Sequence, residues 1–315
     1  MLVYVMETLN SLFRDLIKQA ISLSKSSIHI TEENVFQEGD MNILPLLDKM
    51  VETLILPGSG VDGMANLEDL LDKARSGKSC LLLPEHYSNM DLSLVSCLVR
   101  KEGGRGEEIS GALAAIAGMK LNEDNPVVSA FASAYTRLVI YPSRALIGLD
   151  AEKDRAEIVR SNAINRAAMK VLLDIKVKGR LILVFPSGTR YRPWDPSTKR
   201  GVREIDSYIK SFDYMCPVAI NGQVLNVRQG DMMDDSVSND VVRITAGKVI
   251  SCTEFRNRLR AEADAADVAA AASGADKKDG YEPIDKKQYV ADGIMKALEE
   301  LHIEGEKNRA RYVKS

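Results

Sequence analysis

Two residues in the first third of the chain have the types and spacing that acid–base chemistry requires. His86 and Asp91 lie five residues apart in the segment 82–91. The apolar run before His86 predicts a buried strand, and the polar residues after it predict a helix with Asp91 in its first turn. A carboxylate there can hold one imidazole nitrogen and leave the other free to take a proton. We therefore interpret His86 as a candidate general base that Asp91 orients.

The same pair has a simpler interpretation. Aspartate is a common residue, and an Asp five residues after a His can be a helix cap beside a structural histidine. The position favours function, because sites on open α/β sheets gather at the carboxyl ends of strands.

A second segment, Phe185–Arg192, also follows a run that predicts a buried strand. Pro186 and Gly188 predict a tight turn, and Arg190 and Arg192 would point the same way in an extended segment. Two guanidinium groups on one side suit a phosphate. In the alternative interpretation Arg190 pairs with an acidic neighbour and Arg192 faces solvent.

Ser187 suggests a different chemistry, that of a hydrolase nucleophile served by His86 and Asp91. The nucleophile elbow of such enzymes reads Gly-x-Ser-x-Gly. Phe185 occupies the position of the first glycine, so the sequence does not favour this hypothesis.

The composition limits the classes of function. The chain has 315 residues, a formal net charge of -3 and a pI near 5.8, which gives no general reason to expect nucleic-acid binding. The four cysteines are widely spaced, so we expect buried free thiols. Neither a secretory leader nor a membrane-spanning run is evident. We expect a soluble, cytoplasmic protein, and peripheral contact with a membrane remains an alternative.

The elements that must position these residues follow an alternating order. Stripes of apolar residues predict helices over 9–21 and 43–54, and these form a small N-terminal helical bundle. Short apolar runs then alternate with helices, which predicts an α/β fold with a mixed central sheet and helices on both faces. We expect a helical accessory domain at 1–56 and an α/β domain at 57–315, with a low-complexity insertion at 261–280.

Together the two segments resemble the glycerolipid acyltransferase family, whose members carry His-x-x-x-x-Asp and later Phe-Pro-Glu-Gly-Thr-Arg. Ser187 stands where most members have glutamate. With the Arg-x-Arg that follows, this is similar to the soluble plastid-type glycerol-3-phosphate acyltransferases, which read Pro-Ser-Gly-Gly-Arg-Asp-Arg. The resemblance spans about residues 65 to 250, and the N-terminal bundle also resembles theirs.

The resemblance implies roles for several residues. Arg144, in the segment 139–144, would join Arg190 and Arg192 in binding the acceptor phosphate, although plastid-type relatives carry several basic residues there. Backbone amides near Gly188 would help to bind this phosphate. Supporting positions are Ser187, Thr189 and Pro217, the last on a strand that closes the site.

The implied activity is transfer of a fatty acyl group to the sn-1 hydroxyl of glycerol-3-phosphate in phospholipid biosynthesis. The donor would be a thioester of acyl carrier protein or coenzyme A, and neither a cofactor nor a metal is implied. A 1-acylglycerol-3-phosphate (lysophosphatidate) acyltransferase and a non-catalytic phospholipid-binding protein remain the alternatives.

Overall fold

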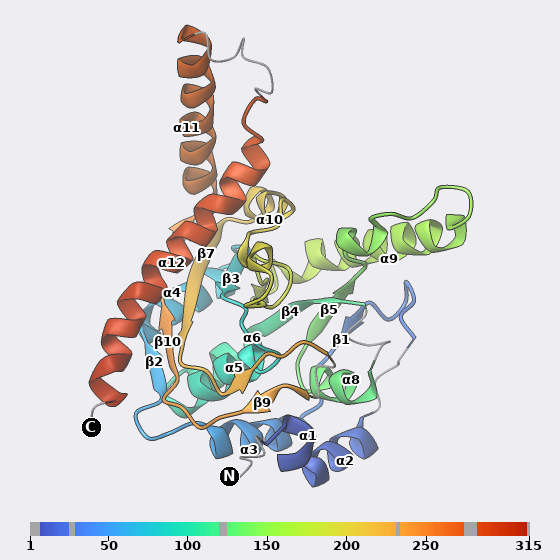
Figure 1. Cartoon of the computed structure of the whole chain (residues 1–315), viewed down its shortest axis with the longest axis vertical. Helices are drawn as coiled ribbons and strands as arrows, with labels where there is room; N and C mark the ends of the chain where they lie inside the picture. The colour runs from blue at the N-terminus through green and yellow to red at the C-terminus, as the bar shows by residue number, and fades with distance from the viewer. Residues whose placement is uncertain (1–6, 25–28, 120–124, 231–233, 274–281, 314–315) are drawn as a thin grey trace.

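A computed structural model of the chain describes residues 7–24, 29–119, 125–230, 234–273 and 282–313. A central sheet runs through the molecule, and helices cover both of its faces (Figure 1). This arrangement confirms the predicted α/β class.

The central sheet has nine described strands in the order β1-β5-β4-β6-β3-β7-β10-β2, with β11 pairing with β7. The strands are β1 (Phe36–Gln37), β2 (Gly60–Asp62), β3 (Cys80–Pro84), β4 (Leu113–Gly118), β5 (Arg137–Ile140), β6 (Leu181–Leu183), β7 (Tyr214–Asn221), β10 (Arg243–Ala246) and β11 (Ile250–Ser251). The five strands from β5 to β7 run parallel, whereas β1, β10 and β11 pair antiparallel. The sheet is therefore mixed, as predicted. Two short strands, β8 (Leu225–Asn226) and β9 (Ser236–Val237), pair separately.

The apolar core lies on both faces of this sheet. Successive side chains of a strand point to opposite faces, so Leu82 packs into one apolar cluster and Leu81 into the other. Both residues are almost fully buried. A strand that is buried on both faces has no polar alternation, which explains the continuous apolar run in the sequence.

The helices divide between the two faces. The first face carries α3 (Leu44–Leu54), α4 (Met64–Arg75), α5 (Asp91–Lys101), α6 (Gly106–Ala112) and α8 (Pro126–Ser133). The second carries α9 (Arg155–Ile175), α10 (Ile205–Ser211), α11 (Cys252–Ala272) and α12 (Lys286–Val313). Two short 3-10 helices, η1 (Ser143–Leu146) and η2 (Pro196–Lys199), lie in connecting segments.

The N-terminal helices α1 (Leu9–Leu12), α2 (Arg14–Leu23) and α3 share the apolar cluster of the first face. The segment 57–60, at the expected boundary between the two domains, leads directly into β2, which pairs with β10. The segment between α2 and α3 also contributes β1 to the sheet. The division of the chain between residues 56 and 57 stays a prediction.

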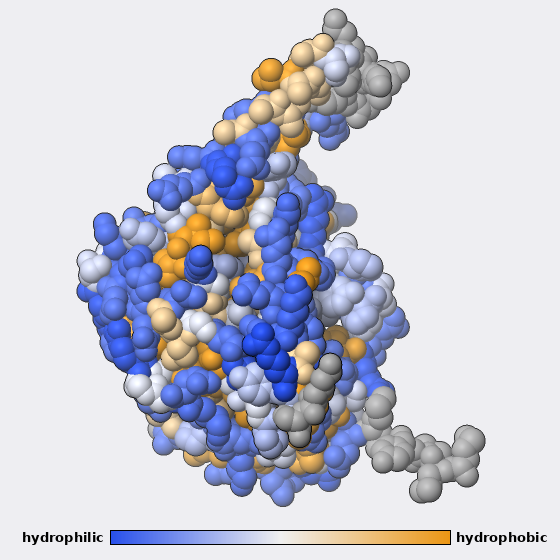
Figure 2. Space-filling model, turned by 90° about the vertical axis from the view of Figure 1, so that its left-hand side faces the viewer, coloured by the Kyte–Doolittle hydropathy of each residue, from blue (hydrophilic) through white to orange (hydrophobic). Residues whose placement is uncertain are grey.

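Helices α11 and α12 form an antiparallel pair whose far end projects from the body (Figure 1). The part of the expected insertion that the structure describes, residues 261–272, is helical and belongs to α11; residues 274–280 lie outside the described residues. Figure 2 shows this pair projecting above a largely hydrophilic face of the body.

Candidate active site

His86 and Asp91 form a hydrogen-bonded pair at the carboxyl end of β3. The His86 Nδ1 atom lies 2.9 Å from Asp91 Oδ2. The backbone N–H groups of Tyr87 and Ser88 donate to the same oxygen at 2.6 and 2.8 Å, and Ser88 Oγ donates to Oδ1 at 2.8 Å. An ionised carboxylate only accepts hydrogen bonds, so this arrangement favours the His86 tautomer with hydrogen on Nδ1. The Nε2 atom then has the lone pair that a general base needs.

The geometry follows from local sequence. Asp91 is the first residue of α5 and is 1% exposed. At a helix N-terminus the free backbone amides and the helix dipole favour a carboxylate. The Asp91 side chain therefore binds the turn that connects β3 to α5, and this turn carries His86.

The parallel pairing of β3 and β6 brings the two sequence segments together. Leu82 lies opposite Leu183 in the register, so both strands end at the same edge of the sheet. Phe185, just beyond β6, stacks on the His86 ring with centroids 4.0 Å apart and planes at 18°. The Tyr191 N–H donates to the His86 carbonyl oxygen at 2.8 Å. The stacking contact restrains the imidazole ring, and the hydrogen bond restrains the backbone of His86.

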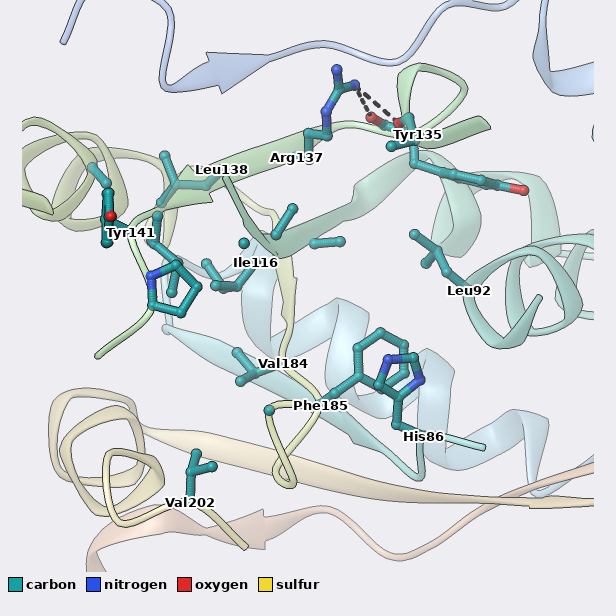
Figure 3. A pocket seen from close by; sticks show the side chains of 18 of the residues that line it. His86, Leu92, Ile116, Tyr135, Arg137, Leu138, Tyr141, Val184, Phe185 and Val202 are labelled. Atoms are coloured by element: carbon teal, nitrogen blue, oxygen red, sulfur yellow. Dashed lines mark hydrogen bonds between the residues drawn. The ribbon is translucent and has the colours of Figure 1, made fainter. Parts of the chain in front are cut away.

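His86 opens onto a cavity of about 550 Å³. This volume lies within the range of about 300 to 1,000 Å³ typical of small-molecule sites. Most of the wall is apolar and comes from β4, β5, α8, α9 and the residues after β6, including Ile116, Val127, Phe131, Leu138, Leu172 and Val184. Figure 3 shows His86 and Phe185 at one side of this cavity and Tyr141 at the other. An apolar space beside His86 has the character that a substrate with a long hydrocarbon chain would need.

Gly188 and its neighbours form the predicted turn after β6. The Gly188 N–H donates to the Phe185 carbonyl at 2.9 Å, and Gly188 has φ +64°. A Cβ at this position would lie 3.0 Å from Val202 Cγ1, so both conformation and space favour glycine. Gly188 lines the cavity.

The supporting positions have structural contacts. Ser187 is buried, and its Oγ donates to the Thr189 carbonyl at 2.7 Å. Thr189 is half-buried. Pro217 is buried in β7 opposite Leu83 of β3. Their roles in the site stay predictions.

The three arginines expected to bind phosphate do not share one location. Arg144, in η1, is exposed and lines the cavity together with Gly188. Arg190 is buried and forms an ion pair with Asp235, which is fully buried. Arg192 is half-buried, and the wall of the cavity includes neither Arg190 nor Arg192. The segment forms turns and no extended strand, so the reason for expecting the two side chains to point the same way does not apply. The assignment of all three as phosphate ligands stays a prediction.

A second histidine–carboxylate pair adjoins the first. Glu85, next to His86, is buried, and its Oε2 accepts from the Ile220 N–H at 2.8 Å and lies 2.8 Å from His302 Nδ1. The Tyr87 hydroxyl donates to Oε1 at 2.8 Å. The hydrogen bond to Glu85 raises the pKa of His302 above 6.5, and burial raises the pKa of Tyr87. Glu85 thus connects α12 to the segment that carries His86.

This connection was missed in the sequence, because His302 lies more than two hundred residues from Glu85. A charged residue directly after an apolar run was the available signal, since a carboxylate that is buried there requires donors.

Arg137 is a second missed feature. It begins β5, is 2% exposed and lines the cavity. Its Nη1 donates to the Ala132 carbonyl at 2.9 Å, and it also binds the Gln37 side chain. Burial lowers the pKa of Arg137 to about 10. Arg137 therefore joins α8 and β1 to the cavity wall.

The cysteine prediction is confirmed for all four positions. Cys80, Cys97, Cys216 and Cys252 are buried free thiols. Burial raises the pKa of Cys80 and Cys216 to about 12, which makes them unreactive.

The acyltransferase family matches residues 64–231, slightly more than half of the chain. The chain therefore belongs to the acyltransferase family. The matched region contains both signature segments and the strands β3 to β7 that position them.

Comparison with solved structures finds the crystal structure of the 1-acyl-sn-glycerophosphate (LPA) acyltransferase PlsC from Thermotoga maritima. The two chains share 15% sequence identity with a TM-score of 0.41, over 92% of this chain and 88% of that chain. No curated protein matches the sequence significantly.

Proposed function

We propose that the protein transfers a fatty acyl group from an acyl thioester to a hydroxyl of a phosphorylated glycerol, with the sn-1 hydroxyl of glycerol-3-phosphate as the acceptor. The observation that carries the proposal is the His86–Asp91 pair at the wall of the apolar cavity. The cavity would hold the acyl chain, and membership of the acyltransferase family supports the class of reaction.

In the proposed reaction His86 Nε2 takes the proton of the acceptor hydroxyl as its oxygen attacks the thioester carbonyl. The new C–O bond forms, the C–S bond breaks, and the thiolate leaves with the proton that His86 held. Asp91 would stabilise the imidazolium between these steps. The acceptor is itself the nucleophile, so no acyl-enzyme intermediate is required.

Phosphate recognition is proposed for Arg144, with Arg190, Arg192 and the backbone near Gly188. Arg144 is the member of this group best placed for this role, because it is exposed at the cavity wall. Acyl carrier protein and coenzyme A are both retained as carriers of the donor. A cytoplasmic location with peripheral contact at a membrane is part of the same proposal.

Lysophosphatidate is the second candidate acceptor, and the arginine geometry favours it. Glycerol-3-phosphate has no apolar part, so the protein must hold it largely through its phosphate. The ion pair with Asp235 engages Arg190, and of the three predicted phosphate ligands Arg144 is the one that lines the described cavity. Lysophosphatidate could add apolar contacts from its own acyl chain.

The test is incubation of the purified protein with a labelled acyl thioester and each acceptor in turn. Labelled lysophosphatidate formed from glycerol-3-phosphate supports the first proposal. Labelled product from lysophosphatidate alone would replace it with the second. Binding of either acceptor without any transfer would favour the non-catalytic alternative.

A further inference from the structure

The outer side of α9 carries an exposed row of basic and apolar residues, interrupted once by the exposed Asn162. We call it the α9 stripe; it consists of Arg155, Val159, Arg166, Met169, Lys170, Leu173 and, just beyond the helix, Val177. Spacings of three and four residues place these side chains on one side of the helix. Val159, Met169 and Leu173 are 59%, 55% and 54% exposed.

The exposed apolar side chains are not needed to attach α9 to the fold. The opposite side of the helix already packs on the sheet through Ile164, Ala168 and Leu172, all buried. An amphipathic surface helix normally presents polar residues outward. A second apolar row that faces outward on the same helix therefore indicates that this surface contacts another molecule.

The charge around the stripe is positive, although the whole chain carries -3. Segment 143–178 contains eight basic and five acidic residues, a net charge of +3. Basic side chains interleaved with apolar ones are typical of helices that lie in the surface plane of a membrane. The basic residues attract anionic headgroups and the apolar residues enter the acyl boundary.

The stripe borders the cavity of the candidate active site. Met169 belongs to the stripe and also lines the cavity, and Arg144 of η1 is exposed on the same wall. Ile147, just after η1, is 79% exposed. In Figure 1, α9 lies on the side of the molecule opposite α12, so the projecting α11–α12 pair does not cover this surface.

We propose that the α9 stripe is the surface by which the protein lies on an anionic lipid layer, with Met169 and Ile147 directing the cavity toward the lipids. This inference rests on the proposed function, because it gives a lipid acceptor or product a path between cavity and membrane. From Val159 to Leu173 the stripe is about 21 Å long at 1.5 Å per residue.

The experiment is co-sedimentation with vesicles of phosphatidylcholine, with and without phosphatidylglycerol. Arg166→Glu/Lys170→Glu reverses two charges of the stripe. Lys307→Glu/Arg311→Glu is the matched control, because these residues are exposed on α12 with the same spacing of four. We expect the wild type and the control to bind phosphatidylglycerol vesicles, and binding of the stripe variant to be at least roughly tenfold weaker. Val159→Ser/Leu173→Ser should weaken binding with little change in its salt dependence.

Two results would overturn the proposal. One is wild-type protein that does not sediment with phosphatidylglycerol vesicles, and the other is equal binding by the stripe variant and its control. Loss of binding to an acidic acyl carrier protein in the stripe variant, with vesicle binding retained, would assign the stripe to a protein partner instead.

Turnover of a short-chain, water-soluble acyl thioester without vesicles separates this inference from the proposed function. Arg166 and Lys170 do not line the described cavity, so both charge variants should turn over at the wild-type rate. Turnover without vesicle binding refutes the lipid surface alone. Vesicle binding without any acyl product refutes the proposed function alone.

Discussion

At the scale of single residues, the environment of His86 has the features that its proposed role as a positioned base requires. Asp91 is buried and receives donors from two backbone amides and the Ser88 hydroxyl as well as the imidazole. A carboxylate held by this many donors cannot rotate away from the ring. The sequence predicts the pair, but the stack of His86 on Phe185 depends on β6 lying next to β3.

Arg190 and Arg144 should respond differently to substitution. Arg190→Met leaves the buried Asp235 carboxylate without its ion-pair partner, and we expect a loss of about 3 to 5 kcal/mol in the free energy of unfolding. Arg190→Met/Asp235→Leu should recover most of it. Arg144→Ala should change stability by less than about 0.5 kcal/mol, because Arg144 is exposed. Urea denaturation measures both effects.

Steady-state kinetics on the same variants test the phosphate assignment. We expect Arg144→Ala to raise the acceptor KM roughly tenfold, as loss of a charged hydrogen bond does. The double variant at positions 190 and 235 should raise it as well if Arg190 contacts the phosphate. An unchanged acceptor KM in the double variant would leave Arg190 with a structural role only.

His302 should make stability depend on pH. Its pKa is raised in the folded protein, chiefly by the hydrogen bond to Glu85, so folding favours the protonated ring. That contribution is fully present below the ordinary histidine value of 6.5 and is lost as pH rises through the raised pKa. Relative to His302→Asn, which keeps a donor near Nδ1 but cannot ionise, the wild type should be more stable by about 1 to 3 kcal/mol at pH 6. Urea denaturation from pH 6 to 9 should show this difference shrinking; a constant difference would contradict the account.

At the scale of elements, the parallel register of β4, β6 and β3 brings the site together. The carboxyl ends of these strands meet at one edge, which places segments a hundred residues apart beside one cavity. The strands were predictable because each is buried on both faces and therefore apolar throughout. The turns that follow them were predictable from proline and glycine.

The depth of the cavity should set the acyl chain that the protein accepts. Ala132, on α8, lines the cavity and is half-buried. Ala132→Phe would fill part of the space, so kcat/KM for long-chain acyl thioesters should fall roughly tenfold or more, while short-chain donors keep their rate. The ratio of the two rates in one preparation controls for changes in folding. Equal losses for all chain lengths would remove this cavity as the acyl site.

At the scale of the whole molecule, the sequence predicted local secondary structure better than contacts between residues that lie far apart in the chain. The alternating core and the His86–Asp91 pair were visible because their causes lie within a few residues. The partners of Arg190 and Glu85 were not, because Asp235 and His302 come from distant segments. Strands β1 and β2 were missed as well, since two or three residues at a sheet edge leave no periodic signal.

Segments from both ends of the chain contact the elements that carry the site. The helix α12 reaches the turn of His86 through His302 and Glu85, and the N-terminal helices pack on the core that supports α5. In the part of the chain that the structure describes, no helix combines the length and apolarity needed to cross a membrane.

The most direct test of the central claim is the rate of acyl transfer by His86→Ala with saturating acyl thioester and phosphorylated acceptor. Circular dichroism and the unfolding midpoint would establish that the variant is folded. The account predicts a fall in kcat of roughly a hundredfold or more, the scale of a positioned general base. A folded His86→Ala protein that transfers acyl groups at the wild-type rate would contradict it.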